Sequence, residues 1–142
     1  YQVGILILVC ITKISAQNIT LTTAKQVVEV YDFQEITLNI KKPDPKLNPF
    51  KQATLNATFS TDNGDNKTVE GFCDSQDGSI YRVRFMPLNA GKYRFELNFT
   101  QNNKTQKLSG SFDAVVSSRK GLLRLDKENP WHFRFDNGEH YF

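Results

Sequence analysis

The sequence predicts an all-β fold, a sandwich of two sheets, and three observations carry the prediction. Aromatic residues are plentiful, with 11 Phe and 5 Tyr against one Trp, and aromatic and β-branched residues favour strands. Apolar and polar residues alternate in short segments separated by turns, at the spacing of roughly 8–12 residues that is typical of sandwiches. No window has the period of an amphipathic helix, so we expect almost no helix.

Four strands are expected in the first half, in chain order Gln26–Tyr31, Glu35–Ile40, Thr54–Ser60 and Lys67–Phe72. Between the second and the third, residues 41–50 contain three prolines and are expected as a loop, because proline cannot donate to a strand ladder. The third strand alternates most regularly in this half, with Leu55, Ala57 and Phe59 on one face. Residues 61–66, with the sequence TDNGDN, are expected as the turn that follows it.

Three further strands are expected in the second half, Tyr81–Phe85, Lys92–Thr100 and Lys107–Val116, after a turn at residues 74–78. The clearest is Lys92–Thr100, because its inward positions are all large and apolar: Tyr93, Phe95, Leu97 and Phe99. These seven strands predict an immunoglobulin-like β-sandwich over residues 18–120.

Residues 121–142 are expected to form a linker and a hairpin. Leu122–Asp126 forms a short strand, and His132–Phe142 turns at Asn137-Gly138, a type I′ signal. A two-residue turn would place Phe133, Phe135, His140 and Phe142 on one apolar face. An apolar face of this size is expected to be buried against another part of the protein. We therefore expect the hairpin to lead into a second domain that is missing from this sequence. The predicted interdomain contacts are Trp131, Phe133, Phe135, His140 and Phe142.

The first seventeen residues are expected to be a secretory signal peptide with a truncated start. An apolar run at residues 5–11 precedes small and polar residues up to Gln17, as in a signal peptide. The run is shorter than the ~20 apolar residues that cross a bilayer, and it lacks the alternation of a buried first strand. We therefore expect a secreted, periplasmic or cell-surface protein without a stable membrane span. Once the signal peptide is removed, Cys73 is the only cysteine left, so no disulfide is expected within the chain.

The composition limits the partners of the chain. Of its 142 residues, 39% are hydrophobic and 23% are charged, which is the composition and length of one globular domain. Its net charge is +3, and its lysines are interspersed with acidic residues. Because no basic stripe could follow a phosphate backbone, we do not expect a nucleic-acid partner.

Three motifs, read together, resemble a known family. They are Val69–Asp74 (VEGFCD), Tyr81–Pro87 (YRVRFMP) and Ala90–Tyr93 (AGKY). They are similar to the N-terminal immunoglobulin-like domain of unknown function that precedes apiosidase-like or collagenase-annotated TIM barrels in secreted bacterial glycoside-hydrolase-like proteins. The similarity spans about residues 26–142. Two departures are Cys73, where an aromatic residue is usual, and a longer turn after Phe72.

The resemblance implies a non-catalytic accessory domain that packs against, or orients, a carbohydrate-active TIM barrel of the same chain. The alternative is a carbohydrate-binding module that binds polysaccharide directly, which exposed aromatic rings on one sheet would favour. The full-length protein would be a glycoside hydrolase. For the chain itself we predict no catalytic residue and no cofactor, because no nucleophilic triad is visible and no carboxylate pair suited to glycoside hydrolysis.

The remaining candidate sites are charged residues. Four acidic residues lie in turns, Asp62, Asp65, Asp74 and Asp77. Aspartate in turns usually caps its own backbone, and calcium is the alternative, because hard oxygen ligands suit it. Arg82 and Arg84 point outward from their strand, and they would bind a partner domain, a carboxylated sugar or only neighbouring acidic residues.

Overall fold

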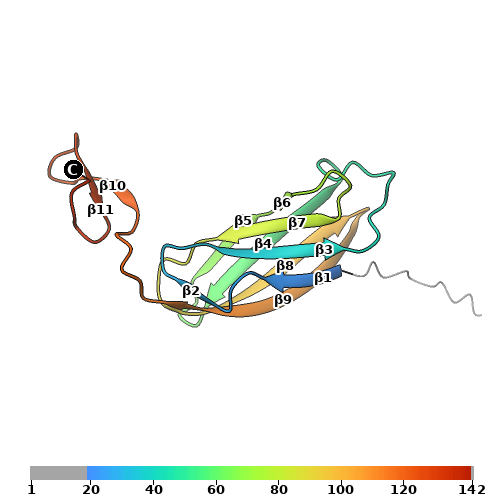
Figure 1. The fold of residues 1–142 in the computed structure, drawn as a ribbon, viewed down its shortest axis with the longest axis horizontal. Coiled ribbons are helices and arrows are strands. Elements are labelled where there is room, and N and C mark those ends of the chain that lie inside the picture. Colours follow the sequence, from blue (N-terminus) through green and yellow to red (C-terminus); the bar gives the residue numbers. More distant parts are fainter. Residues whose placement is uncertain (1–18, 142) are drawn as a thin grey trace, which may run out of the picture.

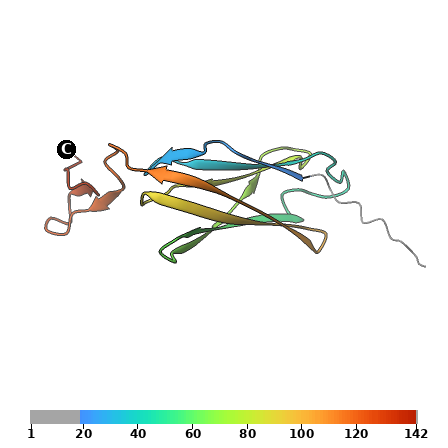
Figure 2. The same cartoon turned by 90° about the horizontal axis from the view of Figure 1, so that it is seen from below.

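A computed structural model of the chain describes residues 19–141, and in this part the predicted all-β sandwich is confirmed (Figures 1 and 2). Two sheets lie face to face as separate layers, and a small two-stranded unit stands beyond one end of them. The predicted signal peptide and Phe142 lie outside the described residues. The described residues form no helix that could span a bilayer.

The first layer is a four-stranded antiparallel sheet in the order β1-β3-β7-β6. Its strands are β1 (Ile19–Thr23), β3 (Gln34–Ile40), β6 (Phe72–Cys73) and β7 (Ile80–Phe85). The sequence did not predict β1, which forms the edge of the sheet and pairs with β3 along its whole length. Its apolar positions, Ile19 and Leu21, pack against the core but stay partly exposed.

The second layer is a five-stranded sheet in the order β2-β9-β8-β4-β5. Its strands are β2 (Val27–Glu29), β4 (Ala53–Thr61), β5 (Asn66–Glu70), β8 (Gly91–Gln101) and β9 (Lys104–Val115). Only β2 runs parallel to its neighbour, β9, within the described sheets. The chain therefore changes layers between β1 and β2, and the resulting strand order is that of an immunoglobulin-like sandwich.

The segment that the sequence predicts as one strand, Lys67–Phe72, is divided between the two layers at Gly71. β5 pairs with β4, whereas β6 pairs with β7. A Cβ atom at Gly71 would lie 2.7 Å from a methyl carbon of Leu55 and 2.8 Å from the carbonyl oxygen of Arg82. Because these distances are shorter than any van der Waals contact, only glycine lets the chain cross so close to both layers.

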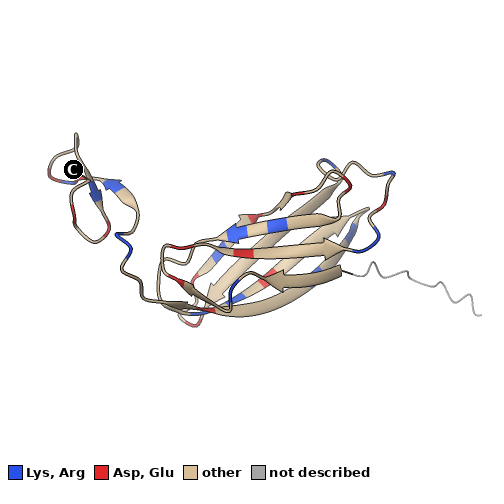
Figure 3. Cartoon of the chain, in the orientation of Figure 1, with Lys and Arg blue, Asp and Glu red and all other residues tan. Residues whose placement is uncertain are grey.

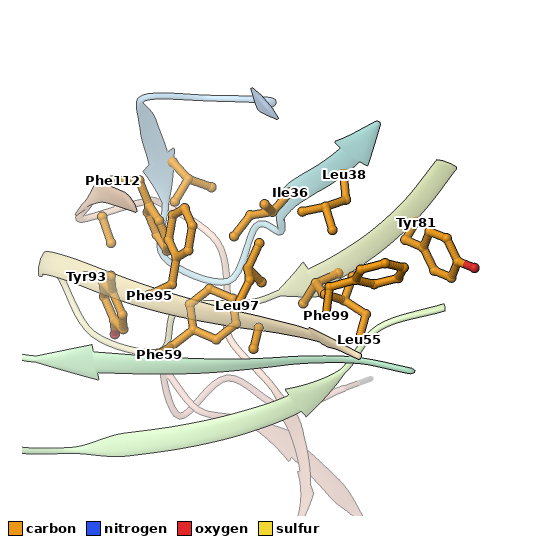
Figure 4. Packing of buried hydrophobic residues seen from close by; sticks show 14 of the residues in the cluster. Ile36, Leu38, Leu55, Phe59, Tyr81, Tyr93, Phe95, Leu97, Phe99 and Phe112 are labelled. Carbon is orange, nitrogen blue, oxygen red and sulfur yellow. The ribbon is translucent and has the colours of Figure 1, made fainter. Parts of the chain in front are cut away.

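The core is built from aromatic rings between the two layers (Figure 4). Phe59 stacks on Phe85 with ring centroids 4.0 Å apart, and Tyr93 stacks on Phe112 at 5.3 Å. Such pairs stabilise a core beyond the area that they bury. The inward positions predicted for Lys92–Thr100 are confirmed, because Tyr93, Phe95, Leu97 and Phe99 are all buried.

The C-terminal unit pairs β10 (Leu123–Leu125) with β11 (Phe133–Phe135), and here the predicted type I′ turn is wrong. Gly138 has a positive φ of 89°, but Asn137 does not, whereas a type I′ turn needs positive φ at both central residues. The N–H of Gly138 donates to the carbonyl of Phe135, and the N–H of Phe135 to that of Glu139. The connection therefore has three residues, with glycine in the left-handed position.

The longer turn shifts the pairing by one residue, and this changes the predicted apolar face. His140 pairs with Arg134 instead of Phe135, so it leaves the face that carries Phe133 and Phe135. Tyr141 takes its place, with its ring 5.9 Å from that of Phe135. A true type I′ geometry occurs elsewhere, at Asn102-Asn103 between β8 and β9, where φ is 52° and 56°.

Candidate functional site

The outward face of the four-stranded sheet carries a group of charged and aromatic side chains near the end from which the C-terminal unit projects. Register places them together, because Glu35 on β3 lies opposite Arg84 on β7, and Phe72 on β6 lies opposite Arg82. Figure 3 shows the blue bands of β7 beside the red band of β3 on this uncovered layer. We call this group the arginine–aromatic strip, and its members are Phe33, Glu35, Phe72, Asp74, Arg82 and Arg84.

Glu35 holds the two arginines of the strip in place. Its carboxylate accepts a hydrogen bond of 2.8 Å from Nε of Arg84 and another from Nη1 of Arg82. Arg82 also donates through Nε to Asp74 at 2.5 Å. The hydrogen bond from Arg84 lowers the pKa of Glu35, with a smaller contribution from Arg82, although burial acts in the opposite direction. The carboxylate is therefore ionised at neutral pH and orients both guanidinium groups.

Two phenyl rings flank Arg84 on the strip. The guanidinium carbon lies 5.3 Å from the ring centre of Phe72 and 5.9 Å from that of Phe33, within the range of a cation–π contact. The rings are 40% and 52% exposed, so they contribute little to the core. Sequence reasoning missed Phe33, Phe72 and Glu35 as site residues. Strand register places Glu35 and Phe72 beside the two outward arginines, whereas Phe33 lies in the loop before β3.

The outward face of the five-stranded sheet has a different composition. Within the strands that the structure describes, it bears mostly polar and charged side chains, with Val27 and Val115 also exposed, and no aromatic ring. Hydroxyl groups pair across it, Thr58 with Thr68 at 3.2 Å and Thr100 with Thr105 at 2.8 Å. Exposed rings are therefore confined to one of the two sheet faces.

Three of the four turn aspartates have local partners. Asp62 forms an ion pair with Arg94, Asp74 belongs to the strip, and Asp77 accepts a 2.6 Å hydrogen bond from the hydroxyl of Ser79, which lowers the pKa of its carboxyl. Asp65 offers its carbonyl oxygen to the N–H of Thr61. Across residues 19–141 no three His, Cys, Asp or Glu side chains come together to hold a metal ion, so the structure adds no support for calcium.

The predicted interdomain residues lie in the C-terminal unit, which Figure 1 shows beyond one end of the sandwich. Trp131 is 93% exposed and Phe133 is 41% exposed, whereas Phe135 is half-buried beside Tyr141. His140 is exposed, and its ring nitrogen lies 3.4 Å from a guanidinium nitrogen of Arg134.

One buried aspartate holds the C-terminal unit together. Asp126 is 5% exposed, and it accepts hydrogen bonds from the N–H groups of Glu128 and Asn129 and from Nε of Arg134. The N–H of Glu128 is the main cause of the lowered pKa of this carboxyl. Because the folded pKa lies below the ordinary one, ionised Asp126 stabilises the unit at neutral pH.

We expect the C-terminal unit to loosen in acid. Protonation of Asp126 removes its charge and weakens its contacts, so the stabilisation is lost as the pH falls below 3.8, the ordinary value, and through the folded pKa. The amide signal of Glu128, followed by NMR against pH, should report this midpoint. Asp126→Asn should abolish the transition, and a midpoint at or above the ordinary value would contradict the role.

An apolar pocket of about 410 Å³ opens at the end of the sandwich that bears the C-terminal unit. Its walls include the core rings Phe59, Phe85 and Tyr93, and Leu122 of the linker contributes to it. The hydroxyl oxygen of Thr61, in the pocket wall, is buried and makes no hydrogen bond within the described residues. The pocket therefore adds an apolar recess to this end of the domain.

The strand order of the two packed sheets defines this chain as an immunoglobulin-like β-sandwich domain. It belongs to the DUF5060 family, a domain of unknown function, whose model matches residues 27–100. The predicted relationship to an immunoglobulin-like domain of unknown function is thereby confirmed. The position before an apiosidase-like barrel stays a prediction.

Among solved structures, the chain is similar to a candidate glycoside hydrolase from Bacteroides vulgatus, with 31% identity and a TM-score of 0.66. The match covers 83% of this chain and 22% of that protein, so the chain corresponds to a small part of that structure. More distant similarity extends to an endo-β-1,4-mannanase from Thermotoga petrophila, with 15% identity and a TM-score of 0.44 over 71% of this chain and 20% of that one. No curated protein matches the chain.

Proposed function

We propose that this chain is a non-catalytic accessory domain of a larger, secreted glycoside-hydrolase-like protein, and that its C-terminal unit packs against a carbohydrate-active TIM barrel. The observation that carries the proposal is the exposure of large apolar side chains on that unit. Their exposed fractions are high: Trp131 93%, Leu125 62%, Tyr141 49%, Leu123 44% and Phe133 41%.

The C-terminal unit is too small to bury these side chains itself. Each of its two paired strands has three residues, and an isolated two-stranded hairpin is marginally stable in water. Its residues contribute nothing to the hydrophobic core of the sandwich. Exposed apolar groups that are clustered in this way mark a surface for another protein domain.

The adjoining end of the sandwich also exposes large apolar side chains. Val116, directly after β9, is 82% exposed, and Leu88 in the β7–β8 loop is 45% exposed. Leu88 also lines the 410 Å³ pocket. The linker is held to this end, because the hydroxyl of Ser117 donates to the carbonyl of Val30 at 2.7 Å and Arg119 forms ion pairs with Glu29 and Asp32.

The comparison with solved structures supports the same proposal. The similar Bacteroides protein is a candidate glycoside hydrolase, and this chain aligns with only 22% of its length. In that protein, a domain similar to this chain therefore stands beside a much larger remainder. An accessory role beside a carbohydrate-active domain fits both the small share and the exposed C-terminal unit.

Trp131 provides a direct test of the proposed contact. In the chain alone, hydroxyl radicals should oxidise Trp131 readily, because its side chain is almost fully exposed. In the natural protein with its carbohydrate-active domain, we expect oxidation of Trp131 to fall at least about tenfold if the ring is buried at the contact. Mass spectrometry of the two proteins under the same dose measures this difference.

Phe50 provides the control for the radical dose. It is 62% exposed, in the loop between β3 and β4, and it should be oxidised equally in both proteins. Equal oxidation of Trp131 in the two proteins would overturn the proposed packing.

A further inference from the structure

The arginine–aromatic strip presents Arg84 to solvent and holds Glu35, the carboxylate that binds it, against the sheet. Side-chain exposure is 57% for Arg84 but 15% for Glu35. Beside the strip, Lys25 is 44% exposed and its partner Asp32 is 18% exposed. Asp74, at 45%, is the exposed acid of the strip, and it is bound to Arg82. A ligand that approaches between Phe33 and Phe72 therefore meets cationic nitrogen atoms first.

The terminal nitrogen atoms of Arg84 are available to such a ligand. Its hydrogen bond to Glu35 uses Nε, and no hydrogen bond among the described residues uses its two Nη atoms. A guanidinium group binds a carboxylate through two parallel N–H donors, which gives both strength and orientation. The strip can therefore bind one carboxylate at Arg84 without losing the contact that positions this side chain.

The two phenyl rings suit the apolar face of a sugar. Their ring centres lie 5.9 Å and 5.3 Å from the guanidinium carbon of Arg84, and the ammonium nitrogen of Lys25 lies 5.8 Å from the ring centre of Phe33. The face of an aromatic ring carries negative potential and attracts polarised C–H groups. Phe33 and Phe72 are both partly exposed on one layer, and the opposite layer has no such ring. A ligand with ring-shaped apolar faces and carboxylates would use all of these groups together.

The strip is also organised before any ligand binds. Glu35 hydrogen-bonds both arginines, and β3 and β7 pair along six residues that include these side chains. Side chains that are already held in place lose less conformational freedom on binding, so more of the interaction energy appears as affinity.

The geometry points to a binding site on the arginine–aromatic strip for an acidic polysaccharide that bears uronate carboxylates. Its sugar rings lie on Phe33 and Phe72, and a carboxylate is bound by Arg84. This inference goes beyond the proposed packing role, which rests on the exposed side chains of the C-terminal unit. Arg84 also lines the 410 Å³ pocket, but no residue of the strip belongs to the C-terminal unit, so either assignment can fail while the other holds.

Polygalacturonate and its fully methyl-esterified form are suitable probes, because they share one backbone and differ in the charge of the carboxyl group. Titration calorimetry should show that the chain binds the acid form at least about tenfold more tightly than the ester. Raising NaCl from about 0.05 M to about 0.5 M should weaken binding of the acid form. Equal binding of the two forms, or no binding by the folded chain, would overturn the inference.

Substitutions locate the site on one sheet face. Arg84→Ala and Phe33→Ala should each weaken binding of polygalacturonate about tenfold. Arg94→Ala is the matched control, because Arg94 is 56% exposed and ion-paired on the other layer. Thermal unfolding of each variant confirms that the sandwich is intact. An equal loss in Arg94→Ala would indicate general attraction to a positively charged protein and would contradict the site.

The remaining possible outcome is that the strip contacts another part of the protein instead of a sugar, and hydroxyl-radical oxidation distinguishes the two. Hydroxyl-radical oxidation of Phe33 and Phe72 should fall in the chain when polygalacturonate is added. Protection of both rings in the longer natural protein without any polysaccharide would assign the strip to a protein contact and overturn the inference.

Discussion

Replacing Phe95 by alanine should lower the free energy of unfolding by about 3–5 kcal/mol, because the substitution leaves a cavity in a closely packed core. Phe95 is 2% exposed, and its ring lies 6.0 Å from that of Phe59. It comes from the centre of β8, which is paired on both sides, with β4 and with β9. Neither neighbouring strand can move inward to fill the space without breaking its own ladder.

Denaturation in urea, followed by far-ultraviolet circular dichroism, measures the loss. Phe50→Ala is the control, because the same side chain at 62% exposure should change stability by less than about 0.5 kcal/mol. A loss below about 1 kcal/mol for Phe95→Ala would contradict the position of this ring in the core.

Adding one methyl group at Gly110 should destabilise the sandwich by about 1–3 kcal/mol, because it overpacks the same region. Gly110 on β9 lies opposite Phe95, and its missing Cβ atom would come 2.5 Å from Cζ of that ring. The ring is enclosed by the core and cannot withdraw. The gain from restricting the unfolded chain, about 0.4–1 kcal/mol for Gly→Ala, is smaller than the cost of the clash.

The control is to make Gly110→Ala in the Phe95→Ala variant, where its effect on the free energy of unfolding should change sign. Without the phenyl ring there is no clash, and only the stabilisation from the lower entropy of the unfolded chain is left. Gly110→Ala should then be neutral or stabilising, and the double-mutant cycle should show a coupling of about 1–3 kcal/mol. The same loss in both backgrounds would show that the backbone at Gly110, and not the ring, is the cause.

The strand pattern could be predicted from the sequence because it depends on neighbours in the chain. Alternation of apolar and polar residues over Lys92–Thr100 is a property of that segment alone, and it places the same side chains inward in any sandwich. The proline-rich loop at 41–50 and the outward direction of Arg82 and Arg84 follow from equally local rules.

The type of turn at Asn137-Gly138 could not be predicted from its own residues. This dipeptide is compatible with a two-residue type I′ turn and also with a three-residue turn in which glycine alone has positive φ. In the folded chain β11 is also paired with β10, and Asp136 receives the N–H of Leu122 and a side-chain contact from Arg124. These contacts are made within the folded C-terminal unit, so the choice of turn, and with it the position of His140, belongs to tertiary structure.

The candidate site depends on tertiary structure to a greater extent. By itself the sequence determined an all-β sandwich, its main strands and two outward arginines. It did not show that Phe33 and Phe72 flank Arg84, because they come from a loop and a two-residue strand that are far apart in the chain. Their proximity requires β3 and β6 to pair with opposite edges of β7, with Gly71 allowing the chain to cross between the layers. Such pairing depends on the packing of the whole domain, whereas alternation depends only on the nearest residues.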